Sequence, residues 1–277
     1  MGQVMKFNLM LFSMVSVLIS NGIHAEEQVQ DVPSQQKKWG ASIGIDYSRN
    51  GYDDDHYLAD RNLALTATIK YYLNASTKFT AIVSGRHSYD GERGEFWSDI
   101  WLTATRYNIW NPTDHLAMSA GSRILIPVSD ESIKNDLNTA IRGNIKFSYS
   151  LDHIIEGLLV SDSIRLRKNF HQYTTAGGHP LEEYRISNLL SVDYMPNKWF
   201  FSTNFVSSKS WSYRGTSYSP ELTYSAELGY QFNDEFSLAT GMTNSASYYD
   251  PDRGPNPIEN LFDLEKPTYY ITLNYDL

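Results

Sequence analysis

The sequence predicts an all-β protein, a transmembrane antiparallel up-and-down β-barrel of about twelve strands. Apolar and hydrogen-bonding side chains alternate through segment after segment, without a break from Thr268 to Leu277. Because successive side chains of a strand point to opposite faces, each such segment has one apolar face and one polar face. Two further observations support a barrel in lipid: short and long connections alternate, and aromatic residues gather at the ends of the apolar faces.

Each alternating segment has about the length that a tilted strand needs to cross a bilayer. We expect the apolar faces to contact lipid and the polar faces to line a lumen. In chain order, the twelve segments begin near Trp39, Leu63, Phe79, Ser98, Leu116, Leu137, Ile154, Arg185, Trp199, Leu222, Phe236 and Thr268. In the sixth segment, Leu137, Thr139 and Ile141 are assigned to the lipid face.

The connections between these segments fall into two classes. Tight turns are expected near residues 74–76, 111–114, 152–153, 196–198 and 233–234. Longer polar loops are expected near residues 49–61, 89–96, 127–136, 167–184, 208–219 and 247–267. Barrels of the bacterial outer membrane have short periplasmic turns and longer external loops. An even number of strands then places both ends of the barrel on the periplasmic side.

The end of the chain resembles a known export signal. Leu277 is apolar and Tyr275, two residues earlier, is aromatic, which is similar to the C-terminal signal by which bacterial outer-membrane barrels are recognised for insertion, although that signal usually ends in Phe. The chain therefore resembles a porin-like outer-membrane β-barrel protein. This resemblance implies the outer membrane of a Gram-negative cell, contact with membrane lipid and lipopolysaccharide, and the barrel-assembly machinery as a partner during insertion.

Three regions are predicted along the chain. Residues 1–25 have the features of a signal peptide: a basic start ending at Lys6, an apolar run over 7–19 that is too short to span a membrane, and a small residue, Ala25, before the expected cut. Residues 26–38 are polar without periodicity and are expected to form a periplasmic tail. Residues 39–277 are expected to form the barrel.

Composition excludes several classes of function. The absence of cysteine excludes a lipoprotein, a disulfide framework and a thiolate metal site. The formal net charge of −9 argues against a nucleic-acid partner. The mean hydropathy of −0.42 is compatible with a membrane barrel, because only alternate residues of each strand must be apolar. We expect no cofactor.

Charged residues at inward positions suggest a function. Six basic residues have inward parity, mainly toward the outer ends of their strands: Arg86, Arg123, Arg142, Lys146, Arg165 and Arg185. The inward acids lie mainly on other strands: Asp46, Asp193, Glu221 and Glu227. A basic lumen concentrates anions and sets selectivity. We therefore expect a monomeric porin-like channel for small polar or anionic solutes. Small twelve-stranded porins for acidic oligosaccharides have a similar size and an arginine-lined lumen, but no diagnostic motif transfers a binding residue from them.

Three alternatives stay open at this stage. The lumen arginines could pair with acids and plug the interior, giving a non-transporting structural, surface or assembly-partner barrel. His87 and Ser98 have outward parity on neighbouring strands and could form the base and nucleophile of a lipid hydrolase at the rim. The acidic loops around Asp53, Asp54, Asp55 and Asp60 and over residues 250–265 could bind Ca²⁺ or Mg²⁺ weakly. We expect these loops to be solvated faces, and the protein to be neither an enzyme nor a metal-binding protein.

Overall fold

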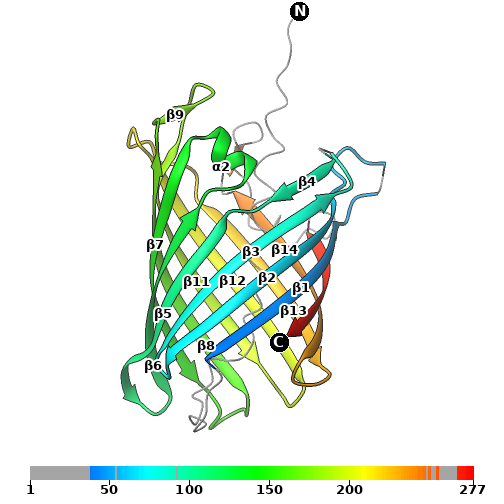
Figure 1. Ribbon diagram of the computed structural model, residues 1–277, viewed down its shortest axis with the longest axis vertical. Helices are drawn as coiled ribbons and strands as arrows, with labels where there is room; N and C mark the ends of the chain where they lie inside the picture. Colours follow the sequence, from blue (N-terminus) through cyan, green and yellow to red (C-terminus); the bar gives the residue numbers. More distant parts are fainter. Residues whose placement is uncertain (1–37, 54, 92, 248, 251–253, 256–266) are drawn as a thin grey trace, which may run out of the picture.

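The twelve long strands of the computed structural model close into one antiparallel β-barrel (Figure 1). The structure describes residues 38–53, 55–91, 93–247, 249–250, 254–255 and 267–277. The long strands are β1 (Trp39–Asn50), β2 (Arg61–Asn74), β3 (Thr77–Ser88), β5 (Ile100–Thr113), β6 (Leu116–Ile126), β7 (Leu137–Ser150), β8 (Leu158–His171), β11 (Glu182–Tyr194), β12 (Trp199–Ser212), β13 (Glu221–Gln231), β14 (Phe236–Ser247) and β17 (Thr268–Asp276). The predicted number of strands and the barrel class are confirmed.

Closure of the barrel joins the two ends of the sheet. Each long strand pairs with its neighbours in the chain, and β1 pairs with β17 from Ser42 opposite Asp276 to Asn50 opposite Thr268. A closed sheet leaves no row of unpaired backbone groups, which a strand in contact with lipid could not tolerate.

The polarity of the two faces is the reverse of that in a water-soluble protein: apolar side chains point outward and polar side chains point inward. On β1, Ile43, Ile45 and Tyr47 are exposed on the outside, whereas Asp46 and Ser48 are buried inside. Exposed apolar residues recur on the outer face of the other strands, and most buried residues are polar. This arrangement is the one expected when lipid is the outer solvent. None of the helices among the described residues is long and apolar enough to cross a membrane.

The connections sort to opposite ends of the barrel, as predicted. The short turns lie at the lower end in Figure 1, and the longer connections lie at the upper end. The upper end also carries the short elements β4 (Gly94–Trp97), α2 (Asp130–Lys134), β9 (Thr175–Ala176), β10 (His179–Pro180), β15 (Tyr249–Asp250) and β16 (Gly254–Pro255).

Aromatic residues mark the lower end of the outer surface. Contacts between neighbouring strands there include Trp39 with Tyr71, at 4.6 Å between ring centroids, and Trp199 with Tyr230, at 4.9 Å. Such girdles form where strands leave the hydrocarbon region.

Two turns differ from their predicted limits. Strand β5 continues through the expected 111–114 turn to Thr113, and bulges near Asn108, whose φ is 53°, absorb the irregular pairing. The turn expected at 152–153 extends over residues 151–157, where Asp152 Oδ1 accepts a hydrogen bond from Gly157 N at 2.8 Å. Strand β8 consequently begins at Leu158 and not near Ile154.

Both ends of the loop expected over residues 167–184 are strand, because β8 runs to His171 and β11 begins at Glu182. The loop expected over residues 89–96 likewise contains most of β4, which pairs with β3. In the 167–184 segment, the adjacent Arg167 and Lys168 put charge on both faces of β8 and conceal the alternation from a reading based on polarity.

Leu137 was predicted on the lipid face but lies inside the barrel. A break in register between Leu137 and Thr139 turns its side chain inward, where it packs with Leu125 and Ala140. This small apolar cluster supports Trp101, the cross-strand partner of Leu125.

Candidate functional site

Four arginines form one continuous row across the inner wall. In the cross-strand register, Arg123 of β6 is opposite Arg142 of β7, Arg142 is opposite Arg167 of β8, and Arg167 is opposite Arg185 of β11. Like charges placed directly opposite each other destabilise a sheet. The row therefore does not serve the stability of the barrel. Its effect is to concentrate positive charge on one side of the lumen.

Three of these arginines surround a single indole ring. The Cζ atoms of Arg123, Arg142 and Arg167 lie 5.4, 5.6 and 5.5 Å from the ring centroid of Trp101. Guanidinium groups at such distances are attracted to the electron-rich face of the ring, which offsets part of their mutual repulsion. Trp101 packs against the apolar cluster of Leu125, Leu137 and Ala140, so the three guanidiniums lie next to an apolar part of the inner wall.

The hydrogen bonds of these three arginines go to neutral side chains and not to carboxylates. Arg123 Nε donates to Thr103 Oγ1 at 2.9 Å, and Arg167 Nε donates to Asn169 Oδ1 at 2.7 Å. The buried Arg142 Nε has no hydrogen-bond partner. Within the described residues, no carboxylate forms an ion pair with any of the three. Guanidinium groups with free N–H donors suit a carboxylate or phosphate ligand.

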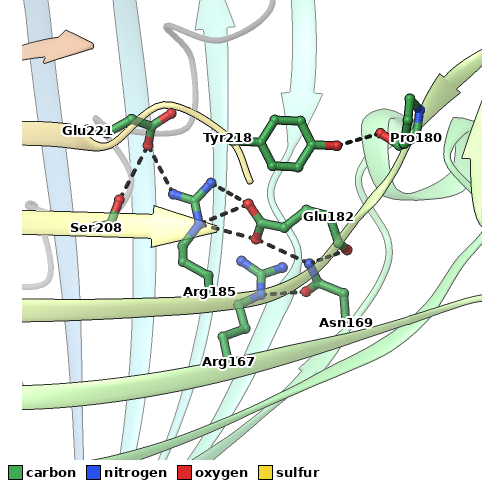
Figure 2. Close-up of polar contacts among 8 residues, drawn as sticks. All are labelled: Arg167, Asn169, Pro180, Glu182, Arg185, Ser208, Tyr218 and Glu221. Atoms are coloured by element: carbon green, nitrogen blue, oxygen red, sulfur yellow. Dashed lines mark hydrogen bonds and ion pairs between the residues drawn. The ribbon is translucent and has the colours of Figure 1, made fainter. Parts of the chain in front are cut away.

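Arg185, at the end of the row, is neutralised by two carboxylates (Figure 2). Its Nη2 lies 2.7 Å from Glu182 Oε2, and its Nη1 lies 3.1 Å from Glu221 Oε2. Glu182 also accepts a hydrogen bond from Asn169 Nδ2 at 3.3 Å, which links this group to Arg167. The pairing that a plugged lumen would require is thus present at Arg185 but not at the three arginines around Trp101.

The other predicted basic residues lie outside the row. Arg165 is opposite Asn144 and Ser187, one inward position closer to the short turns. Lys146 is opposite Ser119 and Ser163. Arg86 lies toward the loop end, with its Cζ 5.2 Å from the ring centroid of Phe96.

Two members of the site were not identified from the sequence. Arg167 was assigned to a loop, although Arg165, Arg167 and Asn169 continue the inward alternation of β8. Trp101 lies between Ile100 and Leu102, and the outward parity of these neighbours already implies an inward indole.

Two of the four predicted acids, Asp46 and Glu227, lie on the wall away from the arginine row and accept hydrogen bonds from hydroxyl groups, whereas Glu221 pairs with Arg185. Thr272 Oγ1 donates to Asp46 at 2.7 Å, and Tyr270 Oη donates to Glu227 at 3.0 Å. Asp193, on β11, accepts a hydrogen bond from Ser202 Oγ at 2.6 Å. Since β6 and β7 are about half the ring away from β17 and β1, the lumen has a basic side and an acidic side.

Two acidic residues, Asp99 and Glu131, lie at the loop end of the barrel near the arginines. Asp99 anchors the 127–136 loop by accepting hydrogen bonds from Ser132 Oγ at 2.5 Å and from two backbone N–H groups. In that loop, Glu131 of α2 has a raised pKa, because burial and then the nearby Asp99 disfavour its charged form, while Arg86 and Arg167 oppose the shift.

The proposed hydrolase pair does not meet. The residue opposite His87 is Glu95, while Ser98 N bonds to Ser84 O, three residues further along β3. At about 3.3 Å per residue, this offset places the two side chains about 10 Å apart. No group of three or more His, Cys, Asp or Glu side chains within the described ranges could hold a metal ion. Asp54 and most of the 250–265 acidic loop lie outside those ranges.

No protein-family model matches the chain, and no curated protein sequence matches it. Solved structures do match it. The NanC porin is similar with a TM-score of 0.56 and 10% sequence identity, over 86% of this chain and 100% of that one. An outer membrane channel from Pseudomonas putida F1 has a TM-score of 0.57 and 10% identity, over 90% of this chain and 98% of that one. The chain therefore has the β-barrel fold of these outer-membrane proteins. At this identity the likeness defines the fold alone, and the lipid-facing surface of the barrel agrees with a place in the outer membrane.

Proposed function

We propose that the protein is an outer-membrane channel that passes small anionic solutes, with carboxylated molecules as the preferred class. The observation that carries this proposal is the group of three guanidiniums around Trp101, which form no ion pair with a carboxylate among the described residues. We name Arg123, Arg142 and Arg167, with Trp101, the arginine–tryptophan cluster.

The cluster offers two kinds of interaction to a solute. The guanidinium forks can donate paired hydrogen bonds to a carboxylate. The indole of Trp101, which is only partly buried and packs on the Leu125 cluster, can contact the carbon skeleton of the same molecule. An organic acid fits both features better than a bare inorganic ion does. The solved porins of similar fold agree with a transport role without defining the solute.

The charge asymmetry of the lumen supports passage over permanent binding. The acids of the opposite side, Asp46 and Glu227 among them, limit how deeply an anion is trapped by the arginines. Conduction requires binding strong enough to admit a solute and weak enough to release it.

Recording of single channels in planar lipid bilayers tests the proposal. The mature protein is expected to conduct, to prefer anions in a salt gradient, and to show current block by a small dicarboxylate. A variant with Arg123, Arg142 and Arg167 all replaced by Gln is expected to conduct with loss of anion preference and of block. The absence of any conductance would favour the non-transporting barrel, and unchanged selectivity in the triple variant would reject the role of the cluster.

A further inference from the structure

A polar pair interrupts the lipid-facing surface of the barrel on β8 and β11. Asn188 Nδ2 donates a hydrogen bond to Asp162 Oδ1 at 2.7 Å. Both residues have outward parity: Asp162 lies between the outward Val160 and Ile164 of β8, and Asn188 is the cross-strand neighbour of Ile164. We call Asp162 and Asn188 the outer polar pair.

The outer polar pair lies well inside the apolar band. Tyr184 and Tyr194 stand near the two ends of the outward face of β11, and Asn188 lies near the middle of the run between them. The hydrogen bond brings the Asp162 carboxylate to the same depth. Among the described long strands, Asp162 is the only carboxylate at an outward position between the aromatic ends. A charged group facing lipid is most unfavourable near the middle of the bilayer.

Within one barrel, the outer polar pair uses only part of its hydrogen-bonding capacity. Among the described residues, no hydrogen bond reaches the second carboxylate oxygen of Asp162, and the Asn188 amide uses one of its two N–H donors there. A free acceptor and a free donor thus lie side by side on a surface that water does not reach.

We propose that the outward face of β8, β11 and β12 binds the same face of a second copy of this chain. A two-fold axis along the membrane normal would bring the free N–H of each Asn188 to the free oxygen of Asp162 in the other copy. The arrangement is self-complementary because each barrel supplies one donor and one acceptor at a similar depth. On β12, Ser207 and Phe205 lie opposite Asn188 and Leu190 and extend the contact surface. This proposal replaces the monomer expected from the sequence, and it does not depend on the transport proposal.

The absence of cysteine makes cross-linking a direct test. A Ser207→Cys variant places one thiol beside the outer polar pair, and Ala67→Cys places one at an exposed outward position of β2, on the opposite wall. Each full-length mature variant is reconstituted in lipid vesicles at low protein density and treated with a short membrane-permeable bis-maleimide. The cross-linked dimer is expected to form at least about tenfold more from Ser207→Cys, because reciprocal hydrogen bonds to a charged group correspond to roughly that factor or more in an association constant.

A second pair of variants separates recognition from folding. Replacement of both Asp162 and Asn188 by Leu in the Ser207→Cys background is expected to reduce dimer formation about tenfold. The folded barrel, measured by its heat-dependent shift on a gel, should persist. The control Ala67→Leu also adds apolar surface to the lipid face and should leave dimer formation unchanged. Equal cross-linking at positions 207 and 67, undiminished cross-linking after the double replacement, or a monomer by sedimentation in detergent would overturn the proposal, whatever lipid or other protein then covers the pair.

Discussion

Removal of a single charge from the arginine–tryptophan cluster has a calculable effect on selectivity. The Cζ atoms of Arg123, Arg142 and Arg167 lie within 5.6 Å of the Trp101 centroid. We take about 5 Å as the distance between one of these guanidiniums and an anion bound beside it at the ring. At that distance one charge contributes about 0.8 kcal/mol in a medium like water and about 3 kcal/mol at an effective dielectric constant of 20. The Debye length at 0.1 M salt is about 10 Å, so salt does not remove the effect.

We therefore expect Arg142→Gln to lower the anion-to-cation permeability ratio by at least about fourfold, which is the factor that corresponds to 0.8 kcal/mol. Arg142 is the best single test because its Nε forms no hydrogen bond that the change would break. The assay is the zero-current potential across a planar bilayer in a salt gradient. Arg106→Gln is the matched control, because this exposed arginine lies near the short turns at an outward position of β5. A ratio for Arg142→Gln within twofold of the wild-type value, or an equal loss in the control, would refute the reasoning.

Three further predictions concern other parts of the barrel. Because the pKa of Glu131 is raised, acidification should neutralise this carboxyl at a higher pH than an ordinary Glu and so increase anion preference, and Glu131→Gln should reduce this pH dependence in the same bilayer assay. A Cβ atom at Gly229 would overlap the ring of Phe200, so Gly229→Ala should lower the free energy of unfolding in urea by about 1–3 kcal/mol, and Phe200→Leu should restore most of the loss if this overlap is the cause. The pKa of Asp90 is lowered by its two hydrogen bonds from Arg61, both at 2.8 Å. The resulting stabilisation is present above the unfolded-state pKa of Asp and is lost as the pH falls through the lower folded-state pKa. Asp90→Asn should therefore lower the free energy of unfolding in urea by about 1–2 kcal/mol at pH 7, and a difference from wild type that did not shrink in acid would contradict the pairing.

The alternation of side chains was sufficient to predict the barrel, its strand number and the ends at which the loops lie, because the period of two is a local property of each strand. Local pattern failed where the strand was irregular or charged on both sides. Leu137 was misplaced because a bulge reverses parity, and no single sequence shows where a bulge falls. Arg167 was assigned to a loop because the outward Lys168 beside it breaks the polarity contrast.

The sequence could not predict that the four arginines lie next to one another across neighbouring strands. Parity places Arg123, Arg142 and Arg185 inside the barrel, but only the register between strands decides whether they form a row or are spread along the lumen. The register depends on turn lengths and bulges, and two of the turns were predicted with incorrect limits. The same limitation applies to His87 and Ser98, which parity predicted on one face of neighbouring strands but which lie three positions apart in register.

The arginine row also links transport to stability. Four arginines in direct cross-strand register repel one another in the empty barrel, and among the described residues only Arg185 has carboxylate partners. An anion that binds the cluster relieves this repulsion in the folded state and finds no such site in the unfolded chain. Binding must then raise the free energy of unfolding, by about 2.7 kcal/mol at a concentration one hundred times the dissociation constant.

Urea unfolding in detergent micelles, with and without a small dicarboxylate at constant ionic strength, measures this linkage. The wild-type midpoint should rise with the dicarboxylate, whereas a chloride salt at the same ionic strength should have a smaller effect. The variant with Arg123, Arg142 and Arg167 replaced by Gln should be at least as stable as wild type without ligand, because the repulsion is gone, and it should not respond to the dicarboxylate. A triple variant that was less stable than wild type and still stabilised by the anion would show that these arginines serve the fold and that anions bind elsewhere.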